Sequence, residues 1–225
     1  MTNMRNLIDV AVDFLTERNW WQFHNPKNDT MCLFTEASEL AEHFIAHEHV
    51  TDATRLGICD EISDVLFAAI VCARSSEIDI ACEMGLMTGD STLSNATTTY
   101  EQLRELAVSQ RNVFDLPADL ATPRQIVLSL VMVIGWLSDV FVWCTGEQSR
   151  FLVNKNRASI TRYLADIFAH IILLVEVMNI DLPGEYRRKM QLDAEKYPSD
   201  AASGEKYEEI KDKHRAAKTN LSDDI

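Results

Sequence analysis

Glycine and proline are scarce in this chain, with seven and five copies in 225 residues. Most tight turns depend on these two residues, so a protein built from many short strands would be expected to contain more of them. Apolar residues recur instead at helical spacing, for example at Leu7, Ile8, Val12 and Leu15. The sequence therefore predicts an all-α fold, in a chain long enough to bury a sizeable core.

An excess of basic residues is also missing. The chain has 21 Lys and Arg against 35 Asp and Glu, which gives a formal net charge of −14. Proteins that bind polymeric nucleic acid generally present a basic face, so we expect no polymeric nucleic acid among the partners. A small phosphorylated ligand is compatible with this charge, because metal ions can supply the positive charge.

Paired cysteines, a signal peptide and a clear membrane span are missing from the pattern as well. The five cysteines show neither CxxC nor Cys/His metal spacing, and their odd number favours buried free thiols in a reducing compartment. Acidic residues interrupt the N-terminal stretch, where a signal peptide needs a continuous apolar run. The run Ile126–Trp143 is nearly long enough to span a bilayer, but Ser129, Ser138 and Asp139 favour a buried core helix. We therefore expect a soluble, intracellular, cytoplasmic protein with no membrane partner.

Two carboxylate pairs stand out in the segment Phe34–Ile70. Glu36 and Glu39 are three residues apart, as are Glu61 and Asp64, so each pair lies on one face of a helix. Two such helices packed antiparallel would direct four carboxylates into one small volume, where their charge is costly unless a cation binds them. Oxygen ligands of this kind suit Mg²⁺. The spacing alone is equally compatible with a solvated acidic helix face.

The rest of the pattern divides the chain into two parts. The segment 87–99 is poor in apolar residues and rich in Ser, Thr and Asn, so it is the predicted linker between a first repeat, 1–86, and a second, 100–225. Pro26 and the Thr51-Asp52 pair are typical of helix starts. Helices are predicted over residues 4–18, 28–47, 52–76 and 101–110.

The pattern before the linker recurs after it. Pro123 stands 97 positions after Pro26, and a long apolar helix is predicted after each; with an offset of 102, SDVLFAAI falls on ADIFAHII. This self-similarity indicates an internal duplication. In these registers Glu36, Glu39, Glu61 and Asp64 fall on Val133, Trp136, Tyr163 and Asp166. Only one of the four acids is kept, so a metal site is predicted in the first repeat alone.

The run RNWWQFHNPKN, followed by TEASELAEHF and DEISDVLFAAIV, resembles the MazG-like all-α nucleoside triphosphate pyrophosphohydrolases, and among them the dCTP pyrophosphatase branch. The superfamily signature is an ExxE, a spacer and an ExxD. Glu36/Glu39 and Glu61/Asp64 match that signature.

The C-terminal run KMQLDAEKYPSD resembles the closing motif of the same family. Lys189, Lys196 and Tyr197 match it, whereas Asp193 stands where the family usually has Asn. The first repeat lacks this motif. The resemblance thus implies two tandem MazG-like repeats, the second degenerate, that form a pseudo-dimeric core of the four-helix-bundle type.

The resemblance also implies an activity, which is Mg²⁺-dependent cleavage of a deoxynucleoside triphosphate to the monophosphate and pyrophosphate. Glu36, Glu39, Glu61 and Asp64 would be the catalytic metal ligands. The substrate implied is dCTP or a related pyrimidine dNTP, and the assembly implied is a homodimer or a pseudo-dimeric monomer.

The aromatic loop before Pro26 resembles the nucleobase-binding segment of the family. Trp20 and His24 are the favoured base-pocket residues, with Gln22 and Lys27 as further candidates, whereas Trp21 is expected to pack into the core. Either role, pocket or hydrophobic plug, is compatible with the residue types.

Other pocket assignments are mixed. Lys189 and Tyr197 would either complete a phosphate site or simply hold the tail in place. Family aromatic positions fall here on Ala46 and Ala68, which argues against dCTP as the assured substrate. Trp143 occupies the place in the second repeat that corresponds to Ala46, and it is expected to be a core residue rather than part of the pocket.

Three functions therefore remain open. The first is a pyrophosphohydrolase for dCTP or a related pyrimidine dNTP. The second is the same chemistry on dUTP or a modified dNTP. The third is a non-catalytic nucleotide-binding or helical interaction protein, against which the intact acid quartet argues.

Overall fold

A computed structural model describes residues 4–46, 50–87, 100–109 and 122–200, together with residues 206, 207, 209, 210 and 212 of the tail. Within these residues the protein is all-helical and contains no strand, which confirms the predicted fold class. Most of the predicted linker, 88–99, lies outside the described residues. The elements are α1 (Met4–Glu17), η1 (Trp21–Phe23), α2 (Pro26–Ala46), α3 (Asp52–Ser75), α4 (Ile80–Met87), α5 (Tyr100–Ser109), α6 (Pro123–Asp139), α7 (Gly146–Lys155), α8 (Arg157–Val177) and α9 (Leu182–Lys196).

Local sequence signals account for where the main helices begin. The side chain of Asn25 accepts a hydrogen bond from the backbone N–H of Asn28 at 3.1 Å, and Pro26 follows as the first residue of α2. Thr51 and Thr122 each cap their helix through a reciprocal capping box, with Thr54 and Gln125 as partners. The four predicted helices are thus present, with ends that differ by one or two residues.

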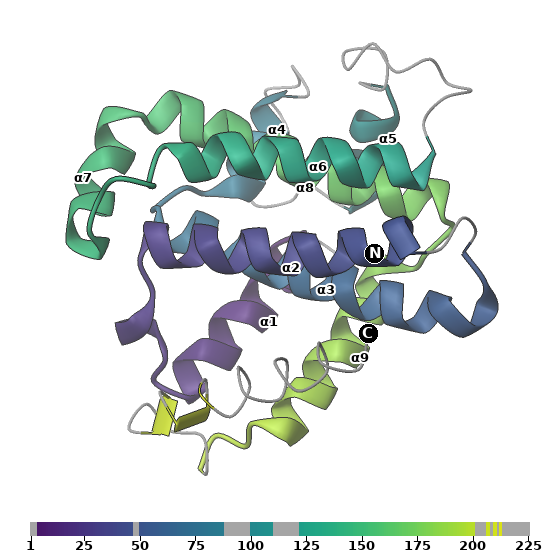
Figure 1. Ribbon diagram of the computed structural model, residues 1–225, viewed down its shortest axis with the longest axis horizontal. Helices are drawn as coiled ribbons and strands as arrows, with labels where there is room; N and C mark the ends of the chain where they lie inside the picture. The colour runs from purple at the N-terminus through teal and green to yellow at the C-terminus, as the bar shows by residue number, and fades with distance from the viewer. Residues whose placement is uncertain are drawn as a thin grey trace.

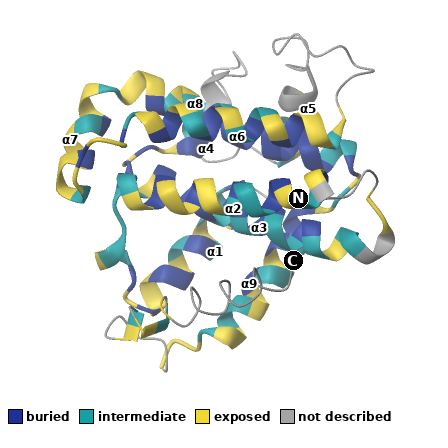
Figure 2. Cartoon of the chain, viewed as in Figure 1, coloured by how far each residue is buried: buried dark blue, intermediate teal, exposed yellow. Residues whose placement is uncertain are grey.

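Helices α2, α3, α6 and α8 form the centre of the molecule. The α2 helix packs on α3 and α6, and α8 packs on α6 and α3, so the contacts close a ring (Figure 1). The α1 and α9 helices cover α3 on one side, while α4, α5 and α7 contact α8. The dark blue, buried residues of Figure 2 lie where these helices face one another.

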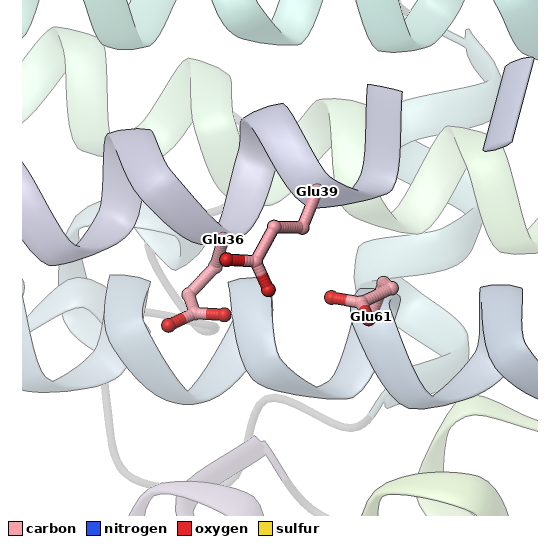
Figure 3. A group of neighbouring side chains, drawn as sticks. All are labelled: Glu36, Glu39 and Glu61. Carbon is pink, nitrogen blue, oxygen red and sulfur yellow. The ribbon is translucent and has the colours of Figure 1, made fainter. Parts of the chain in front are cut away.

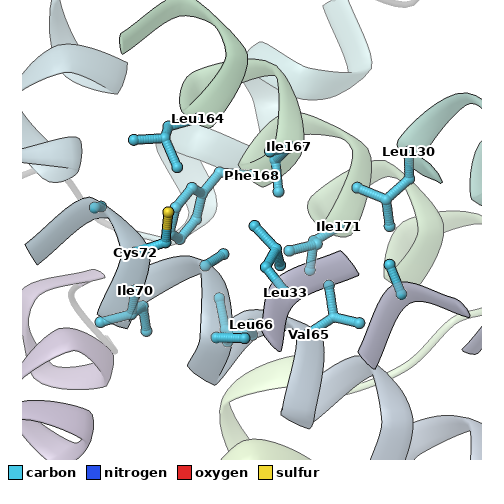
Figure 4. Packing of buried hydrophobic residues seen from close by; sticks show 14 of the residues in the cluster. Leu33, Val65, Leu66, Ile70, Cys72, Leu130, Leu164, Ile167, Phe168 and Ile171 are labelled. Carbon is cyan, nitrogen blue, oxygen red and sulfur yellow. The ribbon is translucent and has the colours of Figure 1, made fainter. Parts of the chain in front are cut away.

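The core between these helices is continuous. Figure 4 shows Leu33 of α2 and Leu66 of α3 in the same cluster as Leu130 of α6 and Phe168 of α8. All four side chains are at most 1% exposed, and burial of a side chain of this size stabilises the fold by roughly 1.5–3 kcal/mol. The four helices that carry these residues are thus fixed against one another by packing.

Several positions that the duplication places in register share the same environment. Leu40 and Leu137 are fully buried, as are Phe44 and Phe141 with at most 5% exposure. These shared environments do not test the tandem-repeat interpretation or its repeat boundaries, which stay predictions.

Two expectations about burial are corrected. The apolar run Ile126–Trp143 is not one helix, because α6 ends at Asp139 and a turn follows, and Trp143 is 94% exposed rather than part of the core. Cys32 is likewise exposed, although Cys59, Cys72 and Cys144 are buried free thiols as expected.

One helix in the described part of the chain, α8, is long and apolar enough to cross a membrane by length and composition. Of its most apolar stretch, 61% is buried against the rest of the protein. The α8 helix packs on α6, α3 and α5.

Candidate metal centre

The carboxylates of Glu36, Glu39 and Glu61 meet between α2 and α3. One oxygen of each lies within 4.8 Å of one oxygen of the others, and all three side chains are half-buried. Figure 3 shows Glu36 and Glu39 descending from α2 towards α3, which carries Glu61. The spacing of three residues brings the two α2 carboxylates onto one face, and the close packing of α2 on α3 brings Glu61 opposite them.

This cluster fits a hard divalent cation. Carboxylate oxygens are ligands that Mg²⁺ and Ca²⁺ prefer, and in an octahedral Mg²⁺ site neighbouring oxygens lie about 2.9 Å apart and opposite ones about 4.2 Å. Only one pair of three oxygens can be opposite, so these carboxylates, whose oxygens lie within 4.8 Å of one another, would have to move closer together to bind one Mg²⁺. Without a cation the three negative charges repel one another in a half-buried position.

Asp64, the fourth acid of the predicted quartet, is held by a lysine instead of joining the cluster. Its Oδ1 accepts a hydrogen bond from Nζ of Lys189 at 2.7 Å, and the same ammonium group pairs with Asp193 at 2.8 Å. Burial raises the pKa of Asp64 to about 6 although the charge of Lys189 counteracts it. Burial alone would lower the pKa of Lys189, but the charges and hydrogen bonds of the two aspartates raise it above its ordinary value.

Lys189 of the C-terminal motif contacts α3 through Asp64. Its two predicted roles, completing a phosphate site or holding the tail in place, stay predictions. Its partners are carboxylates, and Asp193, at the position where the family usually has Asn, is one of them. A second pair from α9, Arg188 to Asp60, lies one helical turn along α3, so Asp60 is an ion-pair partner.

A pocket of about 90 Å³ extends from the acids along the groove between α2 and α3. Glu36 and Asp64 belong to its lining, as do the apolar side chains of Phe67, Ala68 and Val71. Its remaining lining residues are His24, Asp29 and Cys32. A cleft of this kind, apolar with a few convergent polar groups, is typical of small-molecule sites.

A larger cavity of about 640 Å³ also has His24 in its lining. Its walls include Trp21, Arg74 and Arg150 but none of the three clustered carboxylates. We therefore take the smaller pocket, which contains the acids, as the candidate site.

The two tryptophans of the aromatic loop are placed the other way round from expectation. Trp20 is only 6% exposed and packs edge-to-face on Phe14 and Tyr197, whereas Trp21 is half-buried and lines the larger cavity. Tyr207 of the tail also packs on Trp20. Trp20 and Tyr197 therefore contact each other in the interior, and their predicted role in substrate binding is untested.

The other loop candidates are distributed around the site. His24 lines the pocket, and its role in base binding stays a prediction. Gln22 is exposed and donates a hydrogen bond to the backbone oxygen of Asn19 at 2.8 Å. Lys27 donates to the backbone oxygen of Cys144 at 2.5 Å, which ties the start of α2 to the turn after α6.

The corresponding place in the second half holds aromatic side chains. Trp136 and Tyr163, which the duplication places in register with Glu39 and Glu61, lie with ring centroids 6.4 Å apart. Val133 is buried, and Asp166 lies 3.9 Å from Arg162. The positions that the predicted duplication would pair thus carry carboxylates in the first half and aromatic rings in the second.

Comparison with known proteins gives partial matches of one kind. The chain is 32% identical to human dCTP pyrophosphatase 1 over 92 residues, which is 39% of this chain and 54% of the human protein. It is 32% identical to the rat protein of the same name over 81 residues and 30% identical to the bovine one over 78, each covering 46% of the relative. The chain thus spans about half the length of the curated relatives it matches. No family model matches, and no solved structure matches.

These distant, partial similarities suggest the dCTP pyrophosphatase family at most. They agree with the resemblance carried by the ExxE and ExxD motifs.

Sequence reasoning did not single out Asp29 or Cys32, both of which line the pocket. An aspartate in the first turn of a helix is an ordinary feature, because the helix dipole favours it there. The one available signal was position, since residues 29 and 32 precede Glu36 by about two turns and one turn on the same helix.

Proposed function

We propose that this protein is a Mg²⁺-dependent nucleoside triphosphate pyrophosphohydrolase that cleaves a pyrimidine deoxynucleoside triphosphate, dCTP or a close relative, to the monophosphate and pyrophosphate. The observation that carries the proposal is the cluster of Glu36, Glu39 and Glu61 at one end of a small pocket. The partial similarity to the human, rat, mouse and bovine proteins named dCTP pyrophosphatase 1 supports the same chemistry.

The roles of the residues follow from their positions. Glu36, Glu39 and Glu61 would hold the divalent cations. Asp64 would be the fourth ligand, either after its ion pair with Lys189 breaks or while Lys189 stays bound to it. Bound Mg²⁺ supplies positive charge that neutralises the triphosphate and lowers the pKa of water. The carboxylates would fix the position of the cations, and through them that of the phosphates, relative to the pocket, and a carboxylate at the edge of the cluster would accept the proton of the attacking water.

Lys189 has a separate role in this account. In the metal-free protein its ammonium group neutralises part of the charge of Asp64 and Asp193. With substrate present, the same group lies where it can pair with a phosphate oxygen, because Asp64 lines the pocket.

The overall assembly belongs to the same proposal. The ring of contacts between α2, α3, α6 and α8 supports a core built from two related helix pairs, in which the second pair is scaffold. Six of the exposed large apolar side chains belong to α6, the turn after it and α7, and they support a homodimer over a lone pseudo-dimeric chain. These side chains are Leu128, Met132, Trp136, Val142, Trp143 and Phe151.

The test is release of pyrophosphate from a panel of dNTPs and NTPs with Mg²⁺, by the wild type and by the double variant Glu36→Gln/Glu39→Gln. Glu42→Gln is the matched control, because Glu42 is exposed on the same helix. Hydrolysis of a pyrimidine dNTP by the wild type and the control, and not by the double variant, is the expected result. Hydrolysis of dUTP alone selects the alternative substrate, and nucleotide binding without any turnover makes the protein a non-catalytic binder.

A further inference from the structure

The pocket contains a buried ionisable pair that the metal chemistry does not use. Nδ1 of His24 lies 2.6 Å from Oδ1 of Asp29, and the two side chains are 12% and 2% exposed. Asp29 is in the first turn of α2, and His24 ends the aromatic loop just before that helix. Both residues line the pocket that also contains Glu36 and Asp64.

The hydrogen-bonding capacity of this pair is not used up by the protein. A carboxylate offers acceptors only, so Nδ1 of His24 carries the proton and donates it to Oδ1 of Asp29. In the part of the chain that the structure describes, Oδ2 of Asp29 and Nε2 of His24 are buried and make no hydrogen bond. A buried polar atom left in this way destabilises the fold unless a ligand satisfies it.

The shape of the pocket limits what that ligand can be. A water molecule needs about 10–15 Å³ by the same measure, so 90 Å³ holds roughly six to nine atoms of that size. One pyrimidine ring with its substituents has this size, and a purine is larger. Phe67, Ala68 and Val71 provide apolar walls for the faces of a ring, while the metal cluster lies at the Glu36 end for the phosphates.

We propose that Asp29, positioned by His24, reads the edge of the base and selects a pyrimidine that carries an exocyclic amino group. This inference rests on the proposed function for the placement of the phosphates at the carboxylate cluster. The amino group of cytosine donates N–H, which matches the acceptor Oδ2 of Asp29. Uracil and thymine present an oxygen at the same position, and that oxygen would face the acceptor Oδ2.

A purely structural role for Asp29 accounts for less of the geometry. An acid in the first turn of a helix is stabilised by the dipole whether it is exposed or buried. That interaction does not require a side chain at 2% exposure, a histidine partner, or a second oxygen buried at the wall of a cavity.

The variant Asp29→Asn provides a sharp test, because it changes one atom of the pair from acceptor to donor. The amide oxygen of the new side chain still accepts from Nδ1 of His24, so the amide nitrogen takes the place of Oδ2 and presents N–H to the pocket. We expect the wild type to prefer dCTP over dUTP by about 100-fold or more in kcat/KM, and the variant to lower that ratio by about 100-fold. Asp13→Asn, an exposed Asp on α1, is the control for the change of charge and should leave the ratio unchanged.

A second measurement needs no variant and so does not depend on how well Asp29→Asn folds. The wild type is offered dCTP and a triphosphate of the same base without its amino group, and the analogue should be used about 100-fold less well. Binding of non-hydrolysable forms of dCTP and dUTP, measured by calorimetry, gives the same comparison independently of turnover.

The outcomes separate this inference from the proposed function. If dNTPs are hydrolysed in a manner that depends on Glu36 and Glu39, but Asp29→Asn leaves the dCTP to dUTP ratio unchanged, base reading by Asp29 is wrong and the enzyme assignment stands. If the wild type binds dCTP selectively and Asp29→Asn lowers the selectivity by about 100-fold without any turnover, the inference stands and the enzyme assignment fails. Equal use of dCTP and its analogue without the amino group by the wild type overturns the inference directly.

Discussion

Neutralising one carboxylate of the cluster should stabilise the metal-free protein and abolish its stabilisation by Mg²⁺. At 4.8 Å, two unit charges repel by about 0.9 kcal/mol in water and by about 3.5 kcal/mol at an effective dielectric constant of 20. The side chains of Glu36, Glu39 and Glu61 are half-buried, so a value of about 1 kcal/mol for each pair is appropriate. Glu39→Gln removes two such pairs and should add about 2 kcal/mol to the free energy of unfolding.

The effect of the cation has the opposite sign. A ligand that binds only the folded state at about 100 times its Kd adds about 2.7 kcal/mol to the free energy of unfolding. The wild type should gain this stabilisation with Mg²⁺, whereas Glu39→Gln should lose most of it, because the cation loses one ligand charge. The order of stability therefore reverses: the variant is more stable in chelator, and the wild type is more stable in Mg²⁺.

Thermal unfolding followed by circular dichroism, with chelator and with saturating Mg²⁺, measures both effects. For a chain of this length, 2 kcal/mol corresponds to a Tm shift of about 4–8 °C. Glu42→Gln is the control, because it removes the same charge from an exposed position of the same helix. A lower Tm of Glu39→Gln in chelator, or an equal gain with Mg²⁺ in both proteins, would refute the reasoning.

Three further predictions concern other parts of the molecule. Lys189→Met should lower the free energy of unfolding by about 2–3 kcal/mol in urea titrations without metal, because it leaves the charge of Asp64, which is 27% exposed, without a partner. An unchanged urea midpoint of unfolding would show that solvent screens this pair. Burial lowers the pKa of His170, so as the pH falls below about 6.5 the unfolded chain takes up a proton before the folded protein does, and the free energy of unfolding should decrease. His170→Leu should reduce the slope of the free energy of unfolding against pH in this range, and an unaltered slope would exclude His170 as the cause of the pH dependence. Trp143→Ser/Phe151→Ser should shift the protein from dimer to monomer in sedimentation velocity; a monomeric wild type would instead support the pseudo-dimeric chain.

The elements of the fold with a local cause are those that the sequence predicts best. The starts of α2 and α3 have Pro26 and a Thr51 cap, and both helices are found within two residues of their predicted ends. The α7 helix was not predicted, although Thr145 and Gln148 form a capping box of the same kind that could have revealed it.

The misplaced tryptophans have a different origin. Extending the apolar pattern through Trp143 assumed an unbroken helix, but the chain turns after Asp139 and carries that side chain out to solvent. The choice between Trp20 and Trp21 as the buried residue depends on Tyr197 and a tail residue, which are remote in sequence. No local rule encodes such contacts.

The candidate site likewise combines contacts that the sequence predicts with contacts that depend on residues remote in sequence. Three acids of the quartet come together because the helical period fixes each pair and the α2–α3 packing joins them. Asp64 departs from the cluster because α9 brings Lys189 to it from 125 positions away. The pairing of His24 with Asp29 depends on how the aromatic loop folds onto the first turn of α2, which spacing does not specify.

The most direct test of the central claim is the identity of the products formed from dCTP with Mg²⁺ in water labelled with heavy oxygen. The account predicts equal amounts of dCMP and pyrophosphate, with the label in dCMP if water attacks the α-phosphorus, and no turnover by Glu36→Gln/Glu39→Gln. Formation of dCDP and phosphate, or undiminished turnover by the double variant, would contradict the assignment of this carboxylate cluster as the centre of a nucleotide pyrophosphohydrolase.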